Sequence, residues 1–281
     1  MAEVERVWVD GRLLGPAEPA VSALDHGISV GDGAFEALKV VDGVAFAMGR
    51  HLVRFRRTLT GLGLSGFSED RLREGIETVL GGSPIPFGRL RYVVTAGRGP
   101  LGSARLDAPL TYIVAAATVE HPDASGSLVT APWTRNERAA TAGLKTTSYA
   151  DNVIALAYAT DRGAVEAVFA NTRDELCECT GSNVFVVRDG VAITPPLASG
   201  ALAGVTRELT LEWAREAGVP VREEPVPMSH ARDADEVFIT STTKDVLPIH
   251  AWDDRSYAAP GPLTARLVSL FAERAASSMD P

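Results

Sequence analysis

The chain has 281 residues, of which 46% are hydrophobic and 22% charged, and its formal net charge is −9. This length predicts roughly two domains with a core large enough to need no disulfide or metal. The acidic balance argues against a surface for nucleic acid or for an anionic membrane, because both need clustered Lys and Arg.

The sequence also indicates where the protein works. The segment at residues 1–5 carries acidic side chains, unlike a signal peptide. No run of 18 apolar residues occurs, so we expect no membrane span. The two cysteines, Cys177 and Cys179, stand too close in sequence for a disulfide. A reducing, cytoplasmic location is therefore expected.

Alternating apolar residues predict strands in the first 50 residues. A short hairpin is expected around Asp10-Gly11, and residues 35–41 are expected to form a strand. Asp42-Gly43 is the strongest short hairpin signal in the chain. Residues 44–48 are then predicted to form the returning strand.

Two helices are expected next. Leu52, Phe55 and Leu59 recur at helical spacing, and Gly63 is a plausible end. The second helix covers residues 69–80, with Ser68 as its N-cap. Strands at 89–95 and 110–117 complete this part of the chain.

Residues 119–126 are predicted to be a linker, because they are polar, contain Pro and Gly, and show no apolar period. Beyond them, helices are predicted at 149–162, 205–217 and 263–276, and strands at 167–170, 183–187, 191–193 and 236–239. The expected fold class is α+β with two domains. The predicted domains are a small α/β domain over 1–118 and a large domain over 127–281.

Lysine is scarce, since the sequence contains only Lys39, Lys145 and Lys244. Lysine can deprotonate and form Schiff bases, whereas arginine cannot deprotonate in proteins. Lys145 follows a Gly-containing turn just before the helix predicted near Tyr149. A lysine with a chemical role fits this place, although position alone favours an ordinary surface lysine.

Glu178 lies between the two cysteines on a predicted strand. Because strand side chains alternate, Glu178 faces away from both thiols. A part-buried carboxylate needs a cationic or hydrogen-bonding partner, and a pyridinium nitrogen or a salt bridge would both serve. A metal site is not expected, because no further ligands complete a set with the Cys-x-Cys pair.

Three further segments are candidates for binding anions. The small residues of 200–204 lead into a helix at Val205 and Thr206, where free backbone N–H groups would favour an anion. Residues 240–244 carry four hydroxyl side chains into a turn. Arg54 lies on the basic face of the helix at 52–62. Each segment also has an ordinary explanation as a cap, a turn or a solvated face.

Taken in order, these segments resemble the class IV aminotransferases, the pyridoxal-phosphate enzymes of fold type IV. The resemblance extends from Asp25-His26-Gly27 to Leu247-Pro248-Ile249. The family includes D-amino acid transaminases, branched-chain aminotransferases, (R)-selective amine transaminases and aminodeoxychorismate lyases. It implies a two-domain fold of the D-amino acid aminotransferase type, with pyridoxal 5′-phosphate as cofactor.

The resemblance also implies roles for single residues. Lys145 would carry the cofactor and move a proton at the substrate Cα, and Glu178 would hold the pyridine nitrogen protonated. The other cofactor-binding residues would be Arg54, Val205, Thr206 and Thr242 at the phosphate, Leu202 on the ring and Tyr149 at the phenolic oxygen.

The substrate is expected to lie against the strand at 33–41, where Phe35, Ala37 and Lys39 share one face. Arg98 and Thr243 are further candidates for binding it. The Arg-x-His pattern that binds the carboxylate in D-amino acid transaminases is absent, and the loop reads Gly97-Arg98-Gly99. Arg98 is either its substitute or an exposed loop residue.

The sequence favours a transaminase that moves an amino group from a D-amino acid, and from an (R)-primary amine, to an oxo acid such as 2-oxoglutarate or pyruvate. The Gly-Asp-Gly-x-Phe-Glu-x-x-Lys-Val pattern at 31–40 resembles D-amino acid transaminases. An aminodeoxychorismate lyase giving 4-aminobenzoate and pyruvate is the first alternative, and a branched-chain L-amino acid aminotransferase is the second. The family implies a homodimer, and a cofactor-free binding protein is the alternative of a different class.

Overall fold

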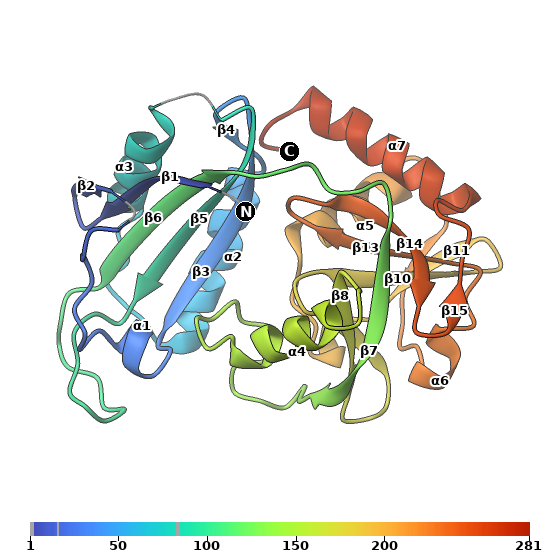
Figure 1. Cartoon of the computed structure of the whole chain (residues 1–281), viewed down its shortest axis with the longest axis horizontal. Helices are drawn as coiled ribbons and strands as arrows, with labels where there is room; N and C mark the ends of the chain where they lie inside the picture. Colours follow the sequence, from blue (N-terminus) through green and yellow to red (C-terminus); the bar gives the residue numbers. More distant parts are fainter. Residues whose placement is uncertain (1–2, 16, 83–84) are drawn as a thin grey trace. The chain divides into compact units, whose positions relative to one another are not determined.

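A computed structural model of the chain describes residues 3–15, 17–82 and 85–281 (Figure 1). They form two compact units. The first unit comprises Met1–His121, Leu144–Tyr149 and Met279–Pro281, and the second comprises Pro122–Gly143 and Ala150–Ser278. Each unit combines helices with a sheet, which confirms the α+β class. No helix in the described part is long and apolar enough to cross a membrane.

The first unit is built on an antiparallel sheet of six strands in the order β2-β1-β6-β5-β3-β4. The strands are β1 (Glu3–Val9), β2 (Arg12–Leu14), β3 (Gly33–Val41), β4 (Val44–Ala45), β5 (Phe87–Thr95) and β6 (Thr111–Thr118). The helices are α1 (His26–Ser29), α2 (Met48–Leu62) and α3 (Glu69–Leu80). Helix α2 packs on β3, and α3 packs on β1 and β6.

The predicted hairpins form at the expected turns. Asp42 and Gly43 both adopt positive φ, 49° and 81°, as a tight turn between two strands requires. The returning strand is shorter than predicted, because β4 ends at Ala45. Ala47 then adopts a left-handed conformation and α2 begins at Met48, so the prediction of a strand to residue 48 is wrong at its end.

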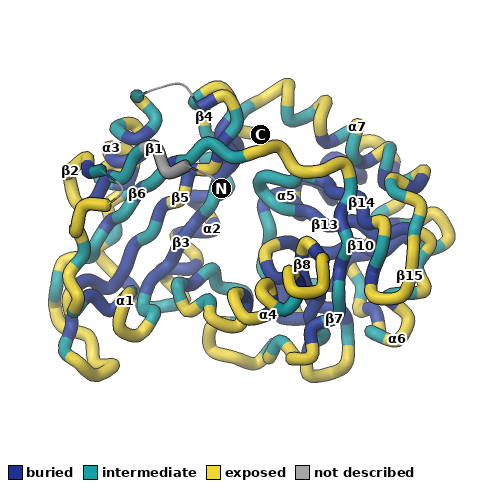
Figure 2. Tube along the Cα trace, in the orientation of Figure 1, coloured by how far each residue is buried: buried dark blue, intermediate teal, exposed yellow. Residues whose placement is uncertain are grey.

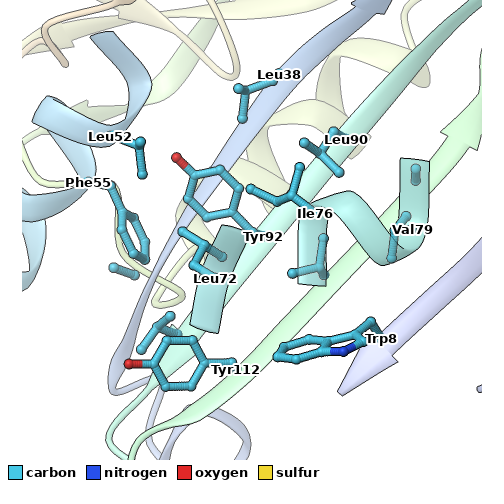
Figure 3. Packing of buried hydrophobic residues seen from close by; sticks show 14 of the residues in the cluster. Trp8, Leu38, Leu52, Phe55, Leu72, Ile76, Val79, Leu90, Tyr92 and Tyr112 are labelled. Carbon is cyan, nitrogen blue, oxygen red and sulfur yellow. The ribbon is translucent and has the colours of Figure 1, made fainter. Parts of the chain in front are cut away.

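Helix α2 confirms the periodicity of its apolar residues. Leu52, Phe55 and Leu59 are buried, and Gly63 ends the helix with φ of 68°. Figure 3 shows Leu52 and Phe55 beside Tyr92 of β5, whose ring meets that of Phe55 edge-on at 5.0 Å. The packing of these buried residues therefore fixes the position of helix α2, and with it the positions of its other side chains.

The second unit contains a mixed sheet of nine strands, eight of them in the order β12-β11-β10-β13-β14-β7-β8-β9, with β15 paired to β14. The strands are β7 (Gly126–Arg135), β8 (Glu166–Asn171), β9 (Leu176–Cys179), β10 (Asn183–Arg188), β11 (Val191–Thr194), β12 (Val221–Glu223), β13 (Glu236–Ser241), β14 (Asp245–Trp252) and β15 (Arg255–Ser256). The helices are α4 (Ala150–Thr160), η1 (Leu197–Ser199), α5 (Val205–Glu216), α6 (Met228–Ala231) and α7 (Pro262–Ser277). Figure 2 shows β10 and β13 as buried.

The helices predicted in this unit are present, with bounds shifted by one or two residues. The strands β7 and β14 were not predicted. Pro132 and Pro248 lie inside them, and proline argues against a strand when a sequence is read locally. Both strands are supported by their neighbours, since β7 pairs with β8 and β14, and β14 pairs with β13.

One segment belongs to a unit that its position in the sequence does not suggest. Residues Leu144–Tyr149 lie in the first unit, although they follow the predicted linker by almost twenty residues. Thr146 forms an antiparallel bridge with Ala34 at the start of β3. The expected domains, 1–118 and 127–281, stay a prediction, but the lysine of this segment stands on the first unit.

We expect Asp280 to stabilise the start of α2. Helix α2 has no side-chain cap of its own, and the Gly49 N–H donates to Asp280 Oδ1 at 2.8 Å. Asp280→Ala should lower the free energy of unfolding by about 1 kcal/mol, as the loss of an N-cap does. Urea unfolding followed by circular dichroism measures this, and Asp280→Asn, which keeps the acceptor oxygen, should lose less. Equal loss in both variants would contradict a capping role.

Candidate active site

Lys145 is held against β3 by backbone hydrogen bonds. The Phe35 N–H donates to the Lys145 carbonyl at 3.0 Å, and the Thr147 N–H donates to the Gly33 carbonyl at 2.8 Å. The Lys145 N–H donates to Thr58 Oγ1 of α2 at 3.3 Å. The segment therefore lies between the start of β3 and α2, and its backbone position is fixed.

The amine of Lys145 lies in an aromatic environment. Its Nζ is 4.4 Å from the centroid of the Phe35 ring and 5.7 Å from that of Tyr149. The two rings meet edge-on with centroids 5.2 Å apart. The predicted residues Phe35, Lys145 and Tyr149 are thus brought together, with the amine half-buried between rings.

A second cation, Arg91, contacts the same Phe35 ring. Its Cζ lies 4.1 Å from the ring centroid. In the register of β3 and β5, Arg91 stands opposite Ala37, so its side chain projects from the same face as Phe35 and Ala37. Burial lowers the pKa of the Arg91 guanidinium from its ordinary value. This face therefore offers two cations, Lys145 and Arg91, beside one aromatic ring.

The other predicted substrate residues of this unit differ in position. Lys39 shares the face of Phe35, but it is buried, and its Nζ lies 4.7 Å from the centroid of the Phe46 ring. Arg98 is exposed in the loop after β5, where its backbone forms a bridge with Asp25.

The opposite face of β3 carries a buried ionic cluster of Glu36, His51 and Arg54. Arg54 donates to Glu36 through Nε at 2.8 Å and Nη2 at 2.5 Å, and His51 Nδ1 lies 2.7 Å from Glu36 Oε2. Burial alone would raise the pKa of Glu36, but the charge and hydrogen bonds of Arg54 and His51 outweigh it and hold that pKa at about 2. Burial also lowers the pKa of His51. The ionised carboxylate fixes the orientation of the Arg54 guanidinium.

In the second unit, Glu178 takes the orientation that strand alternation predicts. Cys177 and Cys179 are buried, whereas Glu178 is 13% exposed on the other face of β9. Both cysteines are free thiols. Burial raises the pKa of Cys177 to about 12, so its thiol is unreactive at neutral pH.

Two groups orient the Glu178 carboxylate. The Leu202 N–H donates to its Oε2 at 2.8 Å, and the Arg135 Nε lies 3.6 Å from its Oε1. A second hydrogen bond holds the backbone of Leu202, because its carbonyl accepts from Asn183 Nδ2 at 2.8 Å. The predicted residues Glu178 and Leu202 are in direct contact.

The start of α5 lies beside this pair. Val205 and Thr206 form its first turn, and no side chain caps the helix at Gly204. A Cβ on Gly204 would stand 2.0 Å from Asn183 Oδ1, so any larger residue there would have to displace the Asn183 side chain. Asn183 is paired with Thr240 on the neighbouring strand β13. The buried hydroxyl of Thr240 has no hydrogen-bond partner among the described residues. Uncapped N–H groups and a buried hydroxyl suit an anionic ligand.

The turn with Thr242 and Thr243 joins β13 to β14 just beyond Thr240. Its third residue, Lys244, forms an ion pair with the buried Glu166. Glu166 also accepts hydrogen bonds from Thr180 Oγ1 and the Gly181 N–H, at 3.0 and 2.7 Å. Burial raises the pKa of Glu166, but the charge and hydrogen bond of Lys244 and the hydrogen bonds from Ser182 and the Gly181 N–H lower it below its ordinary value. The turn is thus tied to the loop that follows Glu178.

The predicted residues form two sets, one in each unit. Lys145, Tyr149, Phe35 and Ala37 gather in the first, where Arg54 lies on the other face of β3, and the second holds Glu178, Leu202, Val205, Thr206, Thr242 and Thr243. Local sequence patterns did not indicate roles for Arg91, Arg135, His51 or Glu36, whereas Thr240 belongs to the hydroxyl segment 240–244 that was predicted to bind an anion. Of these four, Glu36 carried a local signal, because a charged residue at an alternate position of an apolar strand needs a buried partner.

Three comparisons show what the chain is similar to. Residues 33–252 match the family model for amino-transferase class IV. A D-alanine aminotransferase of Bacillus licheniformis is 32% identical over 272 residues, 92% of this chain and 93% of that protein. A branched-chain aminotransferase of the archaeon Thermoproteus uzoniensis, solved with norvaline, has a TM-score of 0.88 at 26% identity and covers 96% of this chain and 94% of its own. A 4-amino-4-deoxychorismate lyase of Pseudomonas aeruginosa has a TM-score of 0.82 at 28% identity and covers 98% and 100%.

Proposed function

The chain belongs to the class IV aminotransferases, whose cofactor is pyridoxal 5′-phosphate, and we propose that it is a transaminase for D-amino acids. The acceptor would be an oxo acid such as 2-oxoglutarate or pyruvate. The observation that carries this proposal is the cluster on β3, where Lys145 and Arg91 both contact the ring of Phe35. An amine that can move a proton, beside a cation that can bind a carboxylate, is what an amino acid substrate requires.

The residues present fit the cofactor. Lys145 would hold it covalently, and Arg54, Val205, Thr206 and Thr242 would bind its phosphate. Glu178 would pair with the ring nitrogen, Leu202 would pack on the ring and Tyr149 would bind the phenolic oxygen. Within the second unit, the buried hydroxyl of Thr240, which has no hydrogen-bond partner among the described residues, and the uncapped start of α5 support a phosphate beside Val205 and Thr206.

When bound, pyridoxal phosphate supplies an electron sink for the negative charge that develops at the substrate Cα. Lys145, once its amine is neutral, would take the proton from the substrate Cα and deliver it to the C4′ carbon of the cofactor. Arg91 would bind the substrate carboxylate through its guanidinium, and we prefer it to Arg98 because Arg91 contacts the same Phe35 ring as Lys145. Phe35 and Tyr149 exclude water from around the amine, which keeps the proton transfer between Lys145 and the substrate.

The D-amino acid preference rests on similarity. The Bacillus licheniformis relative supports it, as does the Gly-Asp-Gly-x-Phe-Glu pattern that leads into β3. The Pseudomonas aeruginosa lyase is a specific reason to keep 4-aminobenzoate formation as the second candidate. Phe35 and Thr243 stay candidates for contacting either substrate.

The assembly and location follow the same proposal. A homodimer is supported by exposed apolar residues on α4, where Val153, Ile154 and Leu156 are 62%, 53% and 43% exposed. Such a surface is typical of a protein interface. Two free buried cysteines are in keeping with the cytoplasm. Sedimentation of the purified protein measures the assembly.

The substrate test follows the visible spectrum of the protein loaded with pyridoxal phosphate. D-Alanine, D-glutamate, L-leucine and (R)-1-phenylethylamine are added separately. We expect the D-acids to convert the cofactor to its amino form, and L-leucine to leave it unchanged. Conversion by L-leucine alone would indicate a branched-chain enzyme. A spectrum that none of the four changes, together with 4-aminobenzoate released from aminodeoxychorismate, would establish the lyase instead.

A further inference from the structure

Arg135, at the end of β7, is enclosed by groups that fix its guanidinium beside Glu178. Its Nε lies 3.6 Å from Glu178 Oε1, and its Nη2 donates to Asn152 Oδ1 at 3.2 Å. Its Cζ lies 4.3 Å from the centroid of the Phe169 ring. Phe169 is the direct partner of Glu178 in the pairing of β8 with β9. The arginine is 18% exposed, so this packing, rather than water, determines where it lies.

The partners of Arg135 are themselves held in place. Asn152, on α4, donates from Nδ2 to the Thr180 carbonyl at 2.5 Å. Its side-chain oxygen is therefore turned toward Arg135. On the other side, Glu178 Oε2 accepts the Leu202 N–H. The Glu178 carboxylate thus has Oε2 held by the Leu202 N–H and Oε1 beside the Arg135 guanidinium, which Asn152 holds in turn.

We propose that Arg135 is a positioning residue for the pyridine nitrogen of the cofactor, acting through Glu178. This rests on the proposed function, which gives Glu178 its ring partner. Arginine stays charged at every working pH, and an adjacent cation favours the ionised form of a carboxylate. Glu178 would then remain an acceptor for a ring N–H, with Oε2 held by the Leu202 N–H and Oε1 beside the Arg135 guanidinium.

The chemistry of the site favours arginine over lysine. The planar guanidinium stacks on Phe169 while its separate nitrogens reach Glu178 and Asn152. An ammonium group is a compact charge that cannot do both. Arg135→Lys should therefore recover only part of the effect that Arg135→Met removes.

The test measures the affinity of the apo-protein for pyridoxal phosphate and for 1-deaza-pyridoxal phosphate, in which carbon replaces the ring nitrogen. Arg135→Met should weaken the binding of pyridoxal phosphate about tenfold or more, as the loss of a charge-assisted hydrogen bond does. It should leave the affinity for the deaza compound unchanged, because that ring offers no N–H to Glu178. Circular dichroism and urea unfolding verify that the variant folds.

Arg138→Met is the matched control. Arg138 lies three residues further along, is 83% exposed and loses only a long contact of 3.9 Å to Glu137. Its affinity for both compounds should equal that of the wild type.

Two results would overturn the inference alone. One is wild-type affinity of Arg135→Met for pyridoxal phosphate. The other is an equal loss of affinity for both compounds, which would mean that Arg135 only supports the structure. If the wild-type protein itself fails to bind pyridoxal phosphate, the proposed function fails, and the inference fails with it.

Discussion

Lys145→Ala should lower kcat for D-alanine by about 10⁴-fold, because the variant loses the amine that is proposed both to hold the cofactor and to move the Cα proton. The fold should survive, since the backbone of Lys145 makes its hydrogen bonds to Phe35 and Thr58, and the side chain is half-buried. Single-turnover kinetics with the loaded protein measures the loss.

Two controls identify the cause. Lys145→Arg keeps the positive charge but should be as inactive as the alanine variant, because arginine does not deprotonate. Added methylamine should restore part of the activity of Lys145→Ala by replacing the missing base. Turnover of Lys145→Ala near the wild-type rate would contradict the role of this residue.

Glu36→Gln should give the largest loss of stability, about 3–5 kcal/mol, because it leaves the buried charge of Arg54 without its counter-ion. The affinity for pyridoxal phosphate should fall as well, since Glu36 orients the guanidinium proposed to bind the phosphate. Urea unfolding of the apo-protein measures the first effect, and titration with the cofactor measures the second.

Glu69→Gln is the comparison for this variant. Glu69 pairs with Arg56 and Arg73, both about half exposed. An exposed pair contributes less than about 1 kcal/mol, so Glu69→Gln should change stability little. A loss from Glu36→Gln no larger than that from Glu69→Gln would show that the cluster does not stabilise the first unit.

The same cluster predicts how stability depends on pH. The pKa of Glu36 is about 2 in the folded protein, below its ordinary 4.5, so the folded state binds this proton less readily than the unfolded state. Its contribution is present above pH 4.5 and is lost as the pH falls toward 2. The lowered pKa of His51 acts in the same direction below its ordinary 6.5. Glu36→Gln should therefore not show the loss of stability between pH 4.5 and 2 that is due to Glu36. Unfolding of the wild type and the variant, measured at a series of acid pH values, tests this.

Local patterns predicted the elements whose cause is local. The Asp42-Gly43 turn, the buried face of α2 and the cap of α3 at Ser68 depend on neighbouring residues, and the structure confirms them. Strand β14 was missed because Pro248 argues against a strand when read locally, whereas pairing with β13 stabilises it.

The candidate site could be predicted only in part, for the same reason. Scarcity and strand alternation made Lys145 and Glu178 candidates, and the resemblance to class IV aminotransferases implied their roles. Arg91, which contacts the same Phe35 ring as Lys145, and Arg135, which lies beside Glu178, come from strands whose positions depend on distant pairing. Nothing near Arg135 in the sequence indicates that it lies beside Glu178.

The central claim is that Lys145 carries the cofactor. The sequence contains only two other lysines, Lys39 and Lys244, so a chemical label can distinguish all three. The loaded protein is reduced with borohydride, digested and examined by mass spectrometry. We predict a phosphopyridoxyl group on the peptide that contains Lys145 and on neither of the others. A label on Lys39 or Lys244 with Lys145 unmodified would contradict the account.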